Sequence, residues 1–175
     1  MTRILKNAFQ IVTAIAAATS ILSADFPAKV VHVSDGDTIK VENLRGQEMT
    51  IRILYIDTPE KFESSKLQKN AYRLGYDPKL EQELGKLASE YAHKNLDHKM
   101  VIIKDEKGLD RYKRMLASVK VSDNSYAARI IADGYSCIYK KEKYPQELDR
   151  LLASARSQKK GLWAVDYDTM DKLCR

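Results

Sequence analysis

Apolar and polar positions alternate over two short segments that flank an Asp-Gly pair. Residues 28–34 and 39–41 carry β-branched side chains at alternating positions, and Asp35-Gly36 lies between the two segments. Alternation of this kind predicts half-buried strands, and an Asp-Gly pair favours a tight hairpin turn. We therefore expect the two segments to form an antiparallel hairpin.

A third strand is predicted over residues 49–56, after a turn at residues 43–47 that contains Gly46. The second half of this strand is nearly all apolar, which is typical of a strand covered on both faces. Such a strand suits a small closed barrel with helices packed outside it.

The rest of the chain is predicted to hold three helices and two further strands. The helices fall at residues 80–96, 125–132 and 145–161, where apolar side chains keep helical spacing, and the strands fall at residues 100–104 and 114–121. Residues 61–79, which contain five lysines or arginines, are interpreted as a mobile basic loop, with an ordinary solvated connection as the alternative. The expected order is β-β-β-α-β-β-α-α.

The first 24 residues differ from the remainder of the chain. Arg3 and Lys6 precede an uncharged stretch rich in Ala, Ile and Val, a pattern typical of a secretory signal peptide. An uncleaved membrane anchor is the alternative, because about 20 apolar residues can span a bilayer. We expect a secreted or periplasmic protein with a single domain over residues 25–175, or a membrane-tethered one if residues 1–24 are retained. The exact cleavage site stays open.

Composition adds a basic balance and a pair of cysteines. Thirty Lys and Arg against 24 Asp and Glu give a net charge of +6, which favours polyanionic partners such as nucleic acid. Cys137 and Cys174 are the only cysteines, and an exported protein can oxidise them. The sequence leaves two alternatives: a disulfide that ties the C-terminal tail to the body, or a buried Cys137 and a free Cys174.

Five residues between positions 35 and 60 suit the chemistry of phosphodiester cleavage. Asp35, Asp37 and Asp57 offer the hard oxygen ligands that Ca²⁺ or Mg²⁺ prefer. Arg52 can bind a phosphate through two parallel hydrogen bonds, and Glu60 can take a proton from water. Each residue has an ordinary alternative, since aspartates are common in turns and a strand arginine can pair with protein carboxylates. Together they predict a metal-dependent phosphodiesterase.

Three longer motifs resemble one protein family. They are SDGDT at residues 34–38, MTIRI at residues 49–53 leading into IDTPE at residues 56–60, and DRYKRMLA at residues 110–117. In this combination the chain resembles the staphylococcal nuclease, or thermonuclease, family from about residue 28 to about residue 163. The resemblance implies an α+β fold with a mainly β core, built as a five-stranded barrel of the oligonucleotide-binding type with three helices.

The resemblance also implies a Ca²⁺ site. Asp37 and Asp57 would ligate the ion through their carboxylates, and Thr58 would add its backbone carbonyl. Asp35 would lie in the outer shell, and water with a substrate phosphate oxygen would complete the coordination. Calcium tolerates such a loose, water-rich set of oxygens better than Mg²⁺ does.

Catalytic and substrate-binding roles follow from the same resemblance. Glu60 would orient or deprotonate the attacking water, while Arg52 and Arg114 would hold phosphate oxygens and stabilise the charge of the transition state. Tyr112 would help to place the nucleotide. The implied reaction cuts DNA or RNA between phosphorus and the 5′ oxygen and leaves 3′-phosphate ends, with single strands preferred.

The chain departs from the family pattern at two sites in particular. Lys113 stands where the family usually has Gly, and the segment after Glu60 is longer than in the family's best-known member. Tyr135, Tyr139 and Tyr144 fall where the correspondence needs a gap, so no base-stacking role is transferred to them. The alternative function is a non-catalytic nucleic-acid or protein-binding module on the same barrel. We expect a monomer with no stable protein partner.

Overall fold

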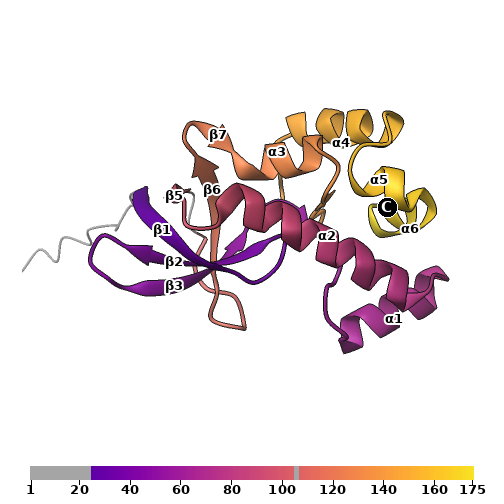
Figure 1. Cartoon of the computed structure of the whole chain (residues 1–175), viewed down its shortest axis with the longest axis horizontal. Helices are drawn as coiled ribbons and strands as arrows, with labels where there is room; N and C mark the ends of the chain where they lie inside the picture. Colours follow the sequence, from indigo (N-terminus) through magenta and orange to yellow (C-terminus); the bar gives the residue numbers. More distant parts are fainter. Residues whose placement is uncertain (1–24, 105–106) are drawn as a thin grey trace, which may run out of the picture.

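A closed barrel of five strands forms the body of the computed structural model, which describes residues 25–104 and 107–175. The barrel strands are β1 (Phe26–Val33), β2 (Thr38–Asn43), β3 (Glu48–Ile53), β5 (Met100–Lys104) and β6 (Met115–Val121). They pair antiparallel in the order β3-β2-β1-β5-β6, and a parallel pairing of β3 with β6 closes the ring. The predicted fold class is therefore confirmed (Figure 1).

The predicted hairpin of β1 and β2 forms around the Asp-Gly turn. Val33 pairs with Ile39, and the Ser34 N–H donates to the Thr38 carbonyl at 3.0 Å. Val30, Val33, Ile39 and Val41 are all within 1% of complete burial, so the alternation does place one face of each strand in the core. Thr38 in turn lies opposite Arg52 of β3, which brings the turn next to the second motif.

The third strand is shorter than predicted. β3 ends at Ile53, and Tyr55 adopts a left-handed φ of 71° that interrupts the extended backbone. The chain then forms β4 (Ile56–Asp57), which pairs antiparallel with β8 (Cys137–Ile138) in a separate small sheet. The apolar end of the expected strand is thus divided between β3 and β4, and Ile53, Leu54 and Ile56 are all buried.

The three predicted helices are present with shifted ends. They are α2 (Pro78–Leu96), α3 (Tyr126–Ala132) and α4 (Glu147–Ser157), and the short strand β7 (Asn124–Ser125) precedes α3. Asp77 caps α2 and places Pro78 in its first turn, where the missing N–H of proline costs nothing. Leu84, Ala88, Ala92 and Leu96 form the buried stripe of α2.

Residues 61–79 are not the mobile loop that the sequence predicted. They contain α1 (Ser65–Leu74), whose first turn is capped by the Ser64 Oγ accepting the Leu67 N–H at 3.1 Å. Gly75 ends the helix with a left-handed φ of 70°. Only Leu67 and Ala71 of α1 are buried, and two apolar positions give too weak a periodicity to predict a helix.

The C-terminal tail adds two helices that the sequence did not predict, α5 (Leu162–Val165) and α6 (Tyr167–Leu173). The described residues thus hold six helices where three were expected. A disulfide joins Cys137 of β8 to Cys174 after α6, with 5.0 Å between the two Cα atoms. Of the two alternatives left by the sequence, pairing is the one observed.

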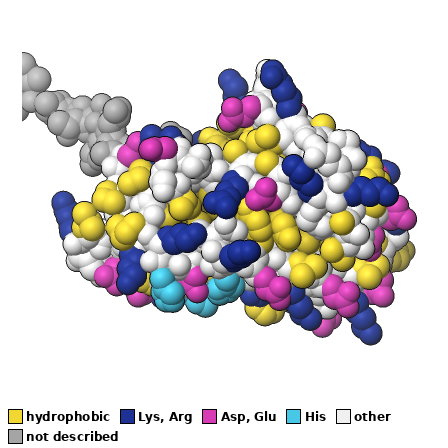
Figure 2. All heavy atoms as spheres, turned by 45° about the horizontal axis from the view of Figure 1, so that its top comes forward, with side chains coloured by type: hydrophobic (Ala, Val, Ile, Leu, Met, Phe, Trp, Pro, Cys, Tyr) yellow, Lys and Arg dark blue, Asp and Glu magenta, His cyan; other side chains and the backbone are white. Residues whose placement is uncertain are grey.

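No helix within residues 25–104 and 107–175 has the length and apolarity needed to cross a membrane. The predicted signal peptide, residues 1–24, lies outside the described residues. On the face shown in Figure 2, Lys and Arg side chains are scattered among acidic and hydrophobic ones and form no single basic field. Net charge alone therefore does not point to a binding face.

Candidate active site

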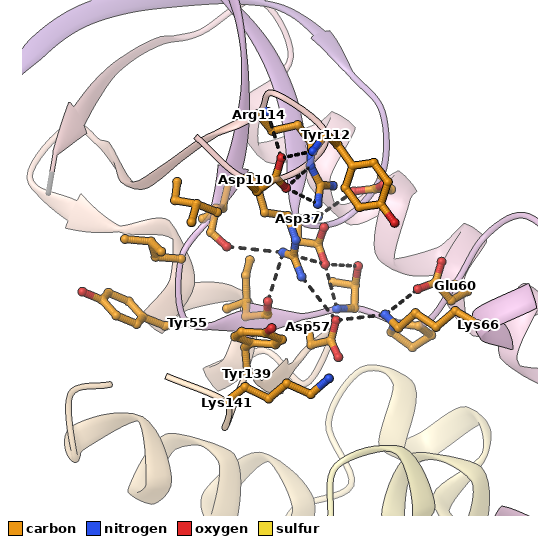
Figure 3. A pocket seen from close by; sticks show the side chains of 18 of the residues that line it. Asp37, Tyr55, Asp57, Glu60, Lys66, Asp110, Tyr112, Arg114, Tyr139 and Lys141 are labelled. Atoms are coloured by element: carbon orange, nitrogen blue, oxygen red, sulfur yellow. Dashed lines mark hydrogen bonds and ion pairs between the residues drawn. The ribbon is translucent and has the colours of Figure 1, made fainter. Parts of the chain in front are cut away.

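One pocket of about 760 Å³ gathers every site residue predicted from the sequence. The lining residues from that set are Asp35, Asp37, Arg52, Asp57, Thr58, Glu60, Tyr112 and Arg114. They come from the β1–β2 turn, the end of β3, the β4 segment and the turn before β6. Figure 3 shows Asp37, Asp57, Glu60, Tyr112 and Arg114 around this pocket. The barrel thus brings together segments that are far apart in sequence, as the contact between Arg114 and Thr38, 76 residues apart, shows.

Asp37 is the most buried carboxylate of the pocket, with 6% of its surface exposed. Its Oδ2 accepts hydrogen bonds from both the backbone N–H and the hydroxyl of Thr58, each at 3.1 Å, and its Oδ1 accepts from the Thr38 hydroxyl at 3.0 Å. The β1–β2 turn therefore lies directly against the segment after β4. A Cβ at Gly36 would lie 2.5 Å from a methyl carbon of Thr58, so this close approach requires glycine.

Arg52 bridges the two aspartates that were predicted to ligate a metal. Its Nη1 lies 2.9 Å from Asp37 Oδ2 and donates to the Ile56 carbonyl at 3.1 Å, while its Nη2 donates to Asp57 Oδ1 at 3.3 Å. Only 14% of the side chain is exposed. The anionic partners of Arg52 in this structure are protein carboxylates, which is the alternative that the sequence had left beside a phosphate contact.

Burial disfavours the charged forms of two aspartates of the pocket, Asp35 and Asp57, and Arg52 does not fully offset this effect. Burial and the neighbouring Asp37 charge raise the pKa of Asp35 to about 7. Burial also raises the pKa of Asp57, whereas the pKa of Asp37 is lowered because Arg52 and the Thr58 N–H outweigh the effect of burial. Two aspartates whose charged forms are disfavoured mark a place where an added cation would be stabilised.

The donor chemistry of this place fits Ca²⁺. Two carboxylates and a backbone carbonyl, with open positions left for water, match an ion that accepts 6–8 oxygen ligands with flexible geometry. About a third of the Asp57 side chain is exposed, so one of its oxygens is accessible from the pocket. Among the described residues, however, no three His, Cys, Asp or Glu side chains form a ready metal cage. Backbone carbonyl groups and water would therefore supply part of the coordination of any bound ion.

Glu60 is held by two residues that sequence reasoning missed. The Lys66 ammonium, from the first turn of α1, lies 2.6 Å from Glu60 Oε1 and 3.5 Å from Asp57 Oδ1 (Figure 3). Glu81 of α2, only 2% exposed, accepts the Glu60 backbone N–H at 3.1 Å. Lys66 gave no signal because α1 was not predicted. Glu81 did give one, since a glutamate on the apolar stripe of an amphipathic helix needs a buried partner.

Asp110 is a third missed residue, and it organises the turn that carries Arg114. Its Oδ1 accepts the N–H groups of Tyr112 and Arg114 at 2.8 Å and 3.0 Å, and its Oδ2 accepts from Arg114 Nε at 2.8 Å. Arg114 Nη1 also donates to the Thr38 hydroxyl at 3.4 Å. Tyr112 is 63% exposed at the rim, with its ring centroid 5.3 Å from Arg114 Cζ. In the sequence, the four-residue spacing of Asp110 and Arg114 could have indicated this ion pair.

Comparison with known proteins adds to this geometry. A family described as "Staphylococcal nuclease homologue" matches residues 50–165. The chain belongs to this family. An uncharacterised protein of Bacillus anthracis is 34% identical over 143 residues, which cover 78% of this chain and 60% of that protein. A protein of Escherichia coli O157:H7 named "Uncharacterized endonuclease" is 30% identical over 145 residues, covering 82% of this chain and 81% of its own length. An uncharacterised protein of Methanocaldococcus jannaschii is 30% identical over 146 residues.

The departures from the nuclease-family pattern have visible structural consequences. Lys113 adopts a left-handed φ of 62°, a conformation that glycine accepts without steric cost and lysine does not. Of the three tyrosines without an assigned role, only Tyr139 lines the pocket, with its ring centroid 5.9 Å from Arg52 Cζ. Tyr135 instead stacks on Tyr91 with 4.5 Å between ring centroids.

Proposed function

We propose that this pocket is the active site of a Ca²⁺-dependent phosphodiesterase that hydrolyses DNA or RNA with little sequence preference and leaves 3′-phosphate ends. The observation that carries the proposal is the convergence of two aspartates, a glutamate and two arginines in one open pocket from four separate segments. Membership of a family whose relatives include proteins named endonucleases supports the same chemistry.

The roles of the protein groups follow from where they lie. A bound Ca²⁺ would polarise a phosphate oxygen and stabilise charge that develops on it. Arg114, fixed by Asp110, has Nη1 directed to the Thr38 hydroxyl and can donate to a phosphate oxygen placed over the pocket. Arg52, which lies between Asp37 and Asp57, would stabilise the same phosphate group. Together these hydrogen-bond donors can stabilise the negative charge of a pentacoordinate phosphorus transition state.

Glu60 would accept the proton of the attacking water. Its side chain is 29% exposed in the pocket, and its backbone is fixed by Glu81, so the carboxylate is accessible but positioned. Attack by the water oxygen forms the new bond to phosphorus, the bond to the 5′ oxygen breaks, and the leaving oxygen takes up a proton from solvent. Because Lys66 is bound to Glu60, catalysis requires this ion pair to open or shift.

A non-catalytic nucleic-acid or protein-binding module is the second candidate, and one observation favours it. Arg52 and Glu60 are both engaged in ion pairs within the protein, as they would be in a domain that does not cut. Such a nucleic-acid module would bind with an affinity that falls as salt is raised and would show no cleavage in any metal.

Replacement of Glu60 by Gln tests the catalytic proposal. The variant keeps the shape and one acceptor oxygen but loses the basic carboxylate, so we expect turnover of single-stranded DNA to fall by about 10²- to 10⁴-fold. The control is Glu63→Gln, at an exposed glutamate three residues away whose one hydrogen-bond donor among the described residues is Gln68 Nε2, at 3.3 Å. Turnover unchanged in Glu60→Gln would remove Glu60 from its assigned role.

We also propose that the protein is exported. The disulfide between Cys137 and Cys174 supports this, because such bonds persist in oxidising compartments and are rare in reducing ones. N-terminal sequencing of the protein recovered from culture medium, periplasm and membrane fractions would distinguish a cleaved signal peptide from a retained anchor.

A further inference from the structure

Helix α1 carries a one-sided cationic stripe. Its sequence, SKLQKNAYRL, contains three cations and no acidic residue. Lys66, Lys69 and Arg73 are spaced three and four residues apart, which places them on one face of a helix. Leu67 and Ala71 are buried on another face. Tyr72, three residues after Lys69, is 92% exposed, so the stripe is flanked by an open aromatic ring.

Helix α1, which carries the stripe, is held in place by an N-terminal cap and by contacts with other elements. Ser64 caps the first turn of α1, and the Lys172 ammonium of α6 donates to the Gly75 carbonyl at its end, at 2.7 Å. The Tyr76 hydroxyl donates to Glu81, the same carboxylate that holds the Glu60 backbone. The C-terminal end of α1 is therefore tied to α6 and, through Tyr76, to the Glu81 carboxylate that also positions Glu60.

The stripe begins inside the pocket. Phe62, Ser65 and Lys66 all line it, and the Lys66 ammonium contacts Glu60 (Figure 3). Phe62 is 67% exposed and has the Lys61 ammonium 4.8 Å from its ring centroid. Lys69 and Arg73 continue the line from Lys66 away from the pocket, and neither has a carboxylate partner in an ion pair within the described part of the chain.

We propose that Phe62, Lys69, Tyr72 and Arg73, here called the α1 surface, bind the stretch of a single-stranded nucleic acid that lies beyond the scissile phosphate. Cations that track the backbone and aromatic rings on which bases stack are the two parts of a sequence-tolerant single-strand site. The proposal rests on the proposed function, since it extends the same substrate site.

The length of the cationic stripe determines how many phosphates beyond the scissile one it can contact. From Lys66 to Arg73 the helix rises about 10 Å, at 1.5 Å per residue. At a spacing of about 3.4 Å per phosphate along a stacked strand, this distance matches two or three phosphates. A dinucleotide held at Arg52 and Arg114 would therefore not reach Lys69 and Arg73, whereas an oligonucleotide of about twelve residues would cover them.

The test compares two substrate lengths by fluorescence anisotropy, with the full chain in chelator so that no cleavage interferes. The double variant Lys69→Met/Arg73→Met should lower the slope of log affinity against log salt by about 1.4 for the long oligonucleotide, at about 0.7 per lost phosphate contact. At 0.1 M salt this corresponds to about 25-fold weaker binding. Tyr72→Ala should weaken binding of the long oligonucleotide by about fivefold or more. Dinucleotide binding should stay within about twofold in both variants.

The matched control removes two other exposed cations, Lys29 of β1 and Lys94 of α2, neither of which lines the pocket. Lys29→Met/Lys94→Met changes the net charge equally and should keep the slope of the wild-type chain. Thermal unfolding at the wild-type temperature verifies the fold of each variant, because all substituted side chains are exposed.

Two results would overturn the proposal. One is a slope of log affinity against log salt for Lys69→Met/Arg73→Met that equals the slope of the control variant. The other is an equal loss of affinity for both substrate lengths. Variant-sensitive binding of polyglutamate without any change for oligonucleotides would also overturn it and would indicate a surface for an acidic protein. Failure of the proposed function has a different signature. In that case neither the wild-type chain nor the variants cleave either substrate in Ca²⁺, whatever they bind.

Discussion

Reduction of the disulfide should lower the free energy of unfolding by an amount that depends on the length of the loop that the disulfide closes. Cys137 and Cys174 are 37 residues apart, and a cross-link that closes a loop of this length removes about 4 kcal/mol of conformational entropy, as free energy, from the unfolded chain. For a domain of about 150 residues this corresponds to a fall in Tm of about 8–16 °C, at 2–4 °C per kcal/mol. The effect reaches the candidate site, because Cys137 pairs with Asp57 between β8 and β4.

Urea unfolding with and without reductant measures the magnitude. The free energy of unfolding of the wild-type chain should fall by about 4 kcal/mol on reduction. The double variant Cys137→Ala/Cys174→Ala should give one and the same value in both conditions. A loss below about 1 kcal/mol on reduction would contradict this prediction, since it would mean that the unfolded chain gains little conformational freedom when the disulfide is opened.

Three further predictions follow from single contacts. Lys113→Gly should raise the free energy of unfolding by about 1 kcal/mol, because it relieves a left-handed φ of 62°; urea unfolding with no gain would contradict this. Glu81→Ala should cost about 2–3 kcal/mol by leaving the Glu60 N–H without its acceptor, and should lower kcat more than it changes KM; wild-type kcat in a folded variant would refute the positioning role. Lys66→Met should raise Ca²⁺ affinity about tenfold in calorimetry, because it removes a charge 3.5 Å from Asp57, while Lys66→Arg should not; equal affinity in all three chains would contradict this.

Local pattern was sufficient to predict the barrel. The alternating segments around Asp35-Gly36 and the strands near residues 100–104 and 114–121 are found where periodicity placed them, because each buries one face in a shared core. The break at Tyr55 was not predictable from alternation, since its left-handed backbone depends on β4 pairing with β8 far along the chain. Helix α1 was missed because its stability comes from its caps and from two buried side chains, Leu67 and Ala71, rather than from a continuous apolar face.

The candidate site was predictable where its residues lie in short motifs and not where they arrive from distant elements. Asp37, Arg52 and Glu60 fall within one run of the sequence, so their convergence needed only the hairpin and the following strand. Lys66 and Glu81 reach Glu60 only through the packing of α1 and α2. The pairing of Arg52 with both aspartates was visible only in the structure, because the sequence favoured a substrate phosphate as its partner.

The most direct test of the proposed function is hydrolysis of denatured DNA by the purified protein with Ca²⁺, with Mg²⁺ and with chelator, using Arg52→Ala as the control. We expect cleavage that depends on Ca²⁺, leaves 3′-phosphate ends and is lost in Arg52→Ala. Salt-dependent binding without cleavage in any metal would contradict it and would assign the pocket to a non-catalytic binding module.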